Sequence, residues 1–154
     1  MQTKSIFIII LSLFLTGCET IRPTWTECTS KVTAVEEGSR VTLRNLENGG
    51  NAQVRLNGVS ALCNEKAGTV AIKIKIGLKL VRDMNQNEGV AELELPLLIA
   101  ILDTQDKVES YESVSYKMTF PPTKSTIYPV ITPKTQMQNS GRVIISLAPQ
   151  VIKP

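Results

Sequence analysis

The feature that most constrains the fold of this chain is the run "TVAIKIKIGLKLVR", residues 69–82, in which every second residue from Val70 to Leu80 is apolar. Because successive side chains of a β-strand point to opposite faces, this pattern predicts a long strand with one buried face and one wet face. Half-buried strands of this kind are typical of antiparallel sheets. The buried face is expected to consist of Val70, Ile72, Ile74, Ile76, Leu78 and Leu80.

The same period of two dominates the chain from Lys31 onward, whereas helical periodicity is hard to find. Residues 40–45 alternate, and "ENGGN" (residues 47–51) follows with an Asn-Gly step typical of a tight hairpin turn, after which residues 52–63 are predicted to return as the partner strand. Seven or eight short strands predict an all-β fold, an antiparallel β-sandwich of immunoglobulin-like or fibronectin-like architecture, with a closed barrel as the alternative. Further strands are predicted at residues 90–103, 108–120 and 142–152, with an extended proline-rich segment at residues 120–134.

The N-terminus has the features of a targeting segment. A short start with one positive charge, Lys4, precedes the apolar stretch "SIFIIILSLFL" at residues 5–15. As a helix this stretch would span roughly 16 Å, about half of a ~30 Å hydrocarbon core. It is therefore too short for a transmembrane anchor and has the length of a signal-peptide core.

The residues that follow, Leu15-Thr16-Gly17-Cys18, resemble the lipobox of bacterial lipoproteins at every position. The resemblance implies that residues 1–17 are a lipoprotein signal peptide, and that Cys18 becomes the first residue of the mature chain. It also implies lipid attachment at Cys18, through the thiol and the new amino terminus, by acyl chains such as palmitate. Three chains hold a protein on a membrane stably, whereas one gives only marginal binding. The alternative is a plain secretory signal that leaves Cys18 as an ordinary thiol.

The position after Cys18 bears on location. Glu19 stands where an Asp would resemble the inner-membrane retention signal of enteric-type bacteria. The resemblance therefore places the protein in the bacterial cell envelope, lipid-anchored, and favours the periplasmic face of the outer membrane over the inner membrane.

With Cys18 acylated, Cys28 and Cys63 are the remaining thiols in an oxidising compartment, and a disulfide between them is predicted. Closing this loop of about 35 residues contributes roughly 3.5 to 4 kcal/mol in the chain-entropy model. A free pair packed in the core and a redox couple are the alternatives, although the spacing is not the Cys-x-x-Cys of redox sites.

The mature chain divides into a tether and one domain. Residues 18–30 are polar and contain Pro23, so we predict a tether there and a single β-sandwich domain over residues 31–154. Two positions are open for Trp25, the headgroup layer of the membrane or one end of the domain core.

A second resemblance covers most of residues 28–147. A cysteine near the mature N-terminus, the arm "VRLNGVSALC", the strand "LPLLIAILDTQDKV" and the closing strand "VIISL" are similar to a group of small lipoproteins of alphaproteobacterial envelopes. This resemblance carries no catalytic motif and bears on location and fold alone.

Catalytic constellations are absent from the sequence. Histidine does not occur, which removes the commonest general base and zinc ligand, and no glycine-rich phosphate loop occurs. We therefore expect no enzyme activity, no cofactor and no metal. Glu92 and Glu94 share one strand face and offer a calcium or acid/base pair, but the simpler interpretation is a wet face paired with the lysines of residues 69–82.

The net charge of +3 is too small for a nucleic-acid-binding protein, so no nucleic-acid partner is expected. Lys73, Lys75 and Lys79 form either a solvated sheet face or an anion-binding stripe. Two functions fit the whole pattern: a membrane-anchored interaction or assembly module with an envelope protein partner, or a small-ligand or carbohydrate-binding lipoprotein that feeds a transporter or enzyme.

Overall fold

The computed structural model describes residues 24–44, 51–82 and 91–147. The expected signal peptide, Cys18, residues 18–23, the centre of the "ENGGN" turn and the end of the last predicted strand lie outside these residues. Within them the chain is β-structure, with two short 3₁₀ turns, η1 (Thr29–Lys31) and η2 (Glu37–Ser39). The strands are β1 (Thr26–Glu27), β2 (Val32–Ala34), β3 (Arg40–Arg44), β4 (Asn51–Lys66), β5 (Thr69–Arg82), β6 (Ala91–Leu102), β7 (Val108–Phe120), β8 (Thr126–Ile127), β9 (Val130–Ile131), β10 (Lys134–Gln138) and β11 (Arg142–Leu147).

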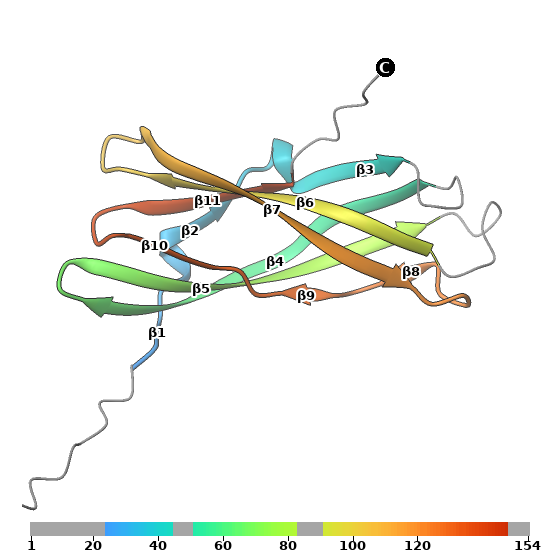
Figure 1. Cartoon of the computed structure of the whole chain (residues 1–154), viewed down its shortest axis with the longest axis horizontal. Helices are drawn as coiled ribbons and strands as arrows, with labels where there is room; N and C mark the ends of the chain where they lie inside the picture. Colours follow the sequence, from blue (N-terminus) through green and yellow to red (C-terminus); the bar gives the residue numbers. More distant parts are fainter. Residues whose placement is uncertain (1–23, 45–50, 83–90, 148–154) are drawn as a thin grey trace, which may run out of the picture.

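The described strands form two sheets (Figure 1). Sheet A is built on the long β4–β5 hairpin; β1 and β3 pair with β4, and β8, β9 and β10 pair with β5. Sheet B has the order β2-β11-β6-β7, in which β2 and β11 run parallel and the other pairs are antiparallel. The prediction of an all-β sandwich is confirmed.

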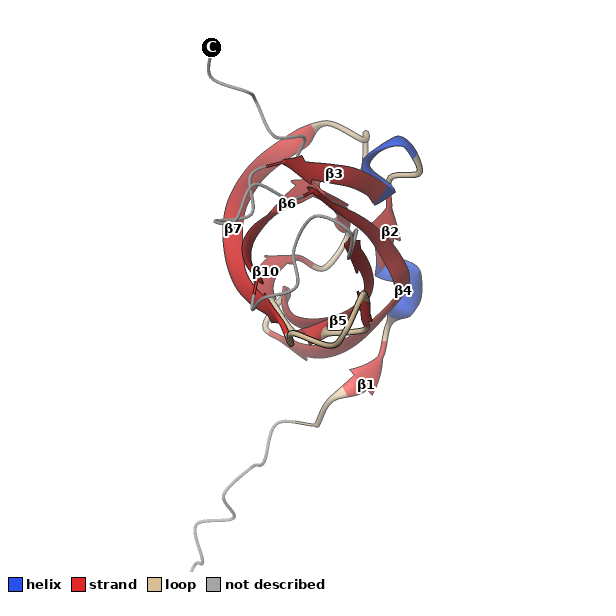
Figure 2. Ribbon diagram, turned by 90° about the vertical axis from the view of Figure 1, so that its right-hand side faces the viewer, coloured by secondary structure: helices blue, strands red, loops and turns tan. Residues whose placement is uncertain are grey.

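The two sheets curve around one apolar core (Figure 2). The alternating face predicted on β5 is buried throughout, and it packs with the inward side chains of β6 and β11. Phe120, at the end of β7, is fully buried and is the one aromatic side chain in the buried core of the described residues. The rest of the core is largely Ile, Leu and Val, as a sequence so poor in aromatic residues requires.

Hairpins connect the longest strands. β3 pairs antiparallel with β4, with Arg44 opposite Asn51, so the hairpin predicted around "ENGGN" is confirmed although its turn lies outside the described residues. β4 turns into β5 through Ala67 and Gly68, which have φ angles of 50° and 82°. Two consecutive positive φ values are characteristic of a type I′ turn, whose twist matches that of the flanking strands.

Arg82, at the end of β5, is buried to 3% exposure on the inward face of the sheet. Its Nε donates to the carbonyl of Lys124 at 3.0 Å, and its Nη2 donates to the carbonyls of Pro121 and Pro122 at 2.8 Å each. The guanidinium carbon lies 5.2 Å from the centroid of the Phe120 ring. Arg82 therefore fixes the segment that carries the chain from sheet B back to sheet A.

Cys28 and Cys63 form a disulfide, as predicted, with their Cα atoms 5.8 Å apart. The bridge joins the segment after β1 to the inward face of β4. It closes a loop that contains β2 of sheet B, η2, and β3 of sheet A. The bridge therefore ties the segment that crosses from sheet B to sheet A to the central strand β4.

We predicted a tether over residues 18–30, and the structure places the described part of it, residues 24–30, against sheet A. β1 pairs with β4, the Cys28 amide donates to the Ala61 carbonyl at 3.0 Å, and Asn64 Nδ2 donates to the Thr24 carbonyl at 2.9 Å. A chain that starts at Glu19 contains the disulfide and every core residue of the part that the structure describes.

Candidate functional site

A row of three cations crosses sheet A on its outward side. In the strand register, Arg40 of β3 lies opposite Arg55 of β4, and Arg55 lies opposite Lys79 of β5. Arg55 and Lys79 each adjoin a buried apolar residue, and Arg40 precedes Val41, which is partly buried against the core, so strand alternation directs all three cations away from the core. Like charges placed directly opposite on a sheet are destabilising, so the fold keeps this row at some cost in stability.

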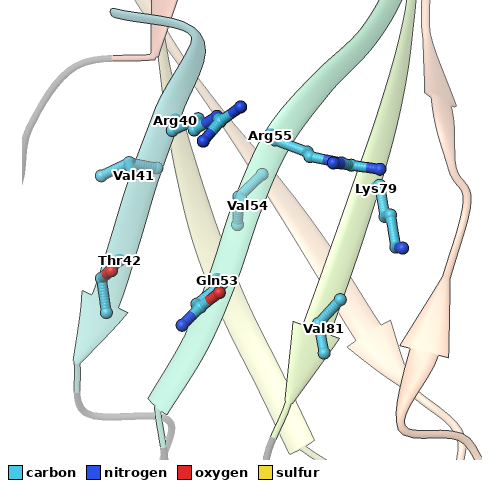
Figure 3. Close-up of a pocket in the computed structure, with 8 residues that line it drawn as sticks. All are labelled: Arg40, Val41, Thr42, Gln53, Val54, Arg55, Lys79 and Val81. Carbon is cyan, nitrogen blue, oxygen red and sulfur yellow. The ribbon is translucent and has the colours of Figure 1, made fainter. Parts of the chain in front are cut away.

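These cations line a shallow depression of about 440 Å³ (Figure 3). In Figure 3 the side chains of Arg40 and Arg55 extend across the sheet in the direction of β5. Thr42, Gln53 and Val81 form a second row beside the cations. The depression offers positive charge and hydrogen-bond donors, which suit an anionic group.

The basic row continues along the sheet. Lys75 and Lys73 follow Lys79 on the same side of β5, and Lys134 of β10 lies opposite Lys73. The outward side chains of Arg40, Arg55, Lys73, Lys75, Lys79 and Lys134 are named the basic face here. The sequence indicated only the three lysines of β5, because the register that adds the other cations comes from separate segments.

Charge divides unequally between the two sheets. The described strands of sheet A carry nine Lys and Arg against two Glu, a net charge of +7. The described strands of sheet B carry two basic residues against four Glu, a net charge of −2. A small total charge therefore conceals a strongly polarised domain, in which one sheet attracts anions and the other does not.

A second feature is the free edge of β7. Within the described residues β7 pairs only with β6, so one side of this 13-residue strand is unpaired. Residues 108–113 are exposed. Among them, Ser110 and Glu112 lie on the same face of β7 that is buried near the C-terminal end of the strand. The first half of β7 therefore extends beyond the cover of sheet A. Pro and Lys on an edge strand usually prevent it from pairing with another chain, and neither occurs in residues 108–116.

The free edges of β7 and β10 border one depression of about 400 Å³. Glu109 and Ser110 line it from β7, and Gln136 and Gln138 line it from β10. Further along β7, burial and, to a lesser extent, the Glu112 carboxylate raise the pKa of Tyr116 above the ordinary value of a tyrosine. We name the unpaired side of β7 together with this depression the β7 edge.

Glu92 and Glu94 lie on the exposed outward side of sheet B. The prediction that they pair with the lysines of residues 69–82 is wrong, because β6 joins sheet B whereas those lysines lie on sheet A. Glu94 instead lies opposite Lys117 of β7, and Glu92 lies opposite Thr119. In the part of the chain that the structure describes, no group of three or more carboxylate, thiol or imidazole side chains is placed to hold a metal ion.

Of the predicted site residues, Cys28 and Cys63 meet in the disulfide, and Cys18 lies outside the described residues. None of the helices among the described residues has the length and apolar character to cross a bilayer. Comparison of the chain with models of protein families, with curated proteins and with solved structures finds no match.

Proposed function

We propose that this protein is an envelope lipoprotein, anchored by acyl chains on Cys18, that acts as a protein-interaction or assembly module. It presents the β7 edge to an extended segment of another envelope protein, which adds to sheet B as a further strand. The observation that carries this proposal is the 13-residue strand β7, unpaired on one side within the described residues and exposed over residues 108–113.

Strand addition suits this edge because main-chain hydrogen bonds supply affinity while side-chain positions supply selectivity. Glu109 and Glu112 lie in the exposed half of β7, so a partner segment with Lys or Arg is favoured over an acidic one. A membrane anchor strengthens such an interaction, since it confines both proteins to one surface and raises their effective concentration.

The anchor rests on the lipobox and on the length of the apolar stretch before it. We place the protein on the periplasmic face of the outer membrane because Glu19, not Asp, follows Cys18. The immunoglobulin-like or fibronectin-like class stays a prediction for the sandwich.

The anchor is tested by the mass of the mature N-terminal peptide. We expect the wild-type chain to carry acyl groups on Cys18 and to lack residues 1–17, and Cys18→Ser to remain unacylated. A lipidated mass that persists in Cys18→Ser would refute the anchor.

The β7 edge is tested by a photo-crosslinking amino acid placed at Ser113 in intact cells. The matched control places the same group at Thr33, an exposed residue of β2 at the opposite edge of sheet B. We expect a defined protein adduct at Ser113 that is absent at Thr33 and is lost when Tyr111, 73% exposed on the same strand, is replaced by lysine. Equal adducts at both positions would show that the edge is not the contact.

A further inference from the structure

Apolar side chains lie exposed among the cations of the basic face. Leu62 of β4 lies opposite Lys73 and is 44% exposed. Val130 of β9 lies opposite the outward-facing Gly77 and is 53% exposed. Tyr128 is 61% exposed, and Lys79 Nζ lies 5.9 Å from its ring centroid. Of the five large exposed hydrophobic residues among those described, three are therefore on one side of sheet A.

This mixture of residues favours a lipid surface over a dissolved anion. Phosphate groups of anionic lipids attract Lys and Arg, while the acyl boundary accepts apolar and aromatic side chains. A dissolved phosphate would use the cations alone and leave the apolar residues exposed to water. The combination is also unlike that of the outward side of sheet B, where the described strands are acidic.

The N-terminal end of the described fold lies on the same side. β1 pairs with β4 at the edge of sheet A, and in Figure 2 it lies at the outer rim of the curved sheets. Just before β1, Lys73 Nζ lies 3.9 Å from the centroid of the Trp25 ring, so this half-buried ring lies beside the basic face rather than at an end of the core. Tryptophan is favoured at membrane interfaces, where its ring is partly apolar and partly polar.

The distance from the lipidated residue is short. Thr24 is the sixth residue after Cys18, and a fully extended chain over those six steps reaches about 20 Å. The tether thus brings this side of the domain to within reach of the headgroups, where attraction acts over about one Debye length, ~8 Å at physiological salt.

We propose that the basic face, together with Trp25, Leu62, Tyr128 and Val130, docks on the surface of an anionic lipid bilayer. This inference rests on the proposed lipid anchor and specifies how the anchored domain is oriented: sheet A lies against the membrane, and sheet B with the β7 edge faces away from it. The like-charge row of Arg40, Arg55 and Lys79 serves this contact, because lipid phosphates neutralise a repulsion that the fold alone leaves in place.

The test uses the unacylated chain from Glu19 to Pro154, so that binding does not depend on the anchor. Its affinity is measured by co-sedimentation with vesicles of phosphatidylcholine and of equal parts phosphatidylcholine and phosphatidylglycerol, at low and high salt. We expect binding to the mixed vesicles that weakens with salt, and far weaker binding to pure phosphatidylcholine. Equal affinity for both vesicles, or no binding, would overturn the proposal.

Two double variants locate the contact. Arg55→Gln with Lys79→Gln removes two charges from the basic face, and we expect about 25-fold weaker binding, about fivefold for each charge. Lys107→Gln with Lys117→Gln removes the same charge from exposed sites at the β6–β7 turn and on sheet B. Equal losses in both would show attraction by net charge alone and overturn the proposal.

A third variant separates a lipid surface from a soluble polyanion. Tyr128→Ser with Val130→Ser keeps every charge, so we expect several-fold weaker binding to the mixed vesicles and unchanged binding to heparin. Unchanged vesicle affinity in this variant would refute the lipid surface. If Cys18 is acylated in cells but the unacylated chain does not bind the mixed vesicles, this inference alone is overturned. If the unacylated chain binds the mixed vesicles but Cys18 carries no acyl group in cells, the anchor alone is overturned.

Discussion

Arg55 of β4 lies directly opposite Lys79 of β5, on the outward side of a sheet whose described strands carry a net charge of +7. On its other side Arg55 faces Arg40 of β3. The residue is therefore flanked by two like charges across the strands, an arrangement that costs stability in an isolated domain. If the row only supports the fold, removing one of its charges should lower the stability of the domain. If the row is kept for a function, the same change should raise the stability.

We predict that Arg55→Gln stabilises the unacylated chain by about 0.2 to 1 kcal/mol, because the substitution removes two like-charge pairs. Urea denaturation at low salt measures the change, and added salt should shrink it. The matched control is Lys75→Gln, since Lys75 faces the uncharged Ser60 and should gain little. A clear loss of stability in Arg55→Gln would mean that the row supports the fold.

The opposite result is expected for Arg82. Arg82→Met leaves three carbonyl oxygens, those of Pro121, Pro122 and Lys124, without this donor. Loss of a buried charged donor costs about 3 kcal/mol or more. Arg82→Lys should be nearly as harmful, because an ammonium group cannot reproduce the planar fork of a guanidinium.

Denaturant unfolding checks this prediction, with Arg55→Met as the exposed-arginine control. Comparable stability of Arg82→Lys and the wild-type chain would show that the charge alone, not the geometry of the three hydrogen bonds, fixes the crossing segment.

The long strands were predictable because each is encoded locally. Alternation in residues 69–82 and the pattern of residues 108–120 give β5 and β7 with their observed bounds. The disulfide also followed from the sequence, since the pairing needed only a cysteine count and a compartment. These features depend on short-range periodicity or on composition.

The assignment of strands to sheets was not predictable, and the errors follow from that. Glu94 was expected to meet the lysines of β5, but it meets Lys117, because the chain leaves sheet A after β5 and builds sheet B with β6 and β7. The basic face was not predicted for the same reason. Arg40, Arg55 and Lys134 belong to three different strands, and only the strand register places them on one side of sheet A. The docking of residues 24–30 was missed because a two-residue strand leaves no periodic signal.

The turn between β4 and β5 lacks the usual Asn-Gly sequence, so a single substitution there should raise the stability of the domain. Ala67 has a φ of 50°, a left-handed conformation that costs an alanine about 1 kcal/mol or more, whereas Asn tolerates it. We predict that Ala67→Asn raises the free energy of unfolding by about 1 kcal/mol, and that Gly68→Ala, at a φ of 82°, lowers it. Thermal unfolding of both variants checks the sign, and a stabilising Gly68→Ala would contradict the turn geometry.

The last prediction concerns the disulfide and Trp25, the one tryptophan in the sequence. Cys28→Ser with Cys63→Ser should lower the free energy of unfolding by roughly 3.5 to 4 kcal/mol, because a loop of about 35 residues is no longer closed in the unfolded chain. β1 is only two residues long, so without the bridge it should detach from β4 before the domain unfolds, as weakly held chain ends do. Trp25 fluorescence should then shift to the red and become open to iodide quenching at urea concentrations where far-ultraviolet circular dichroism still reports the intact sheets. Coincident fluorescence and dichroism transitions in the double variant would show instead that the contacts of Trp25 with Lys73, and of Thr24 with Asn64, hold the segment without the bridge.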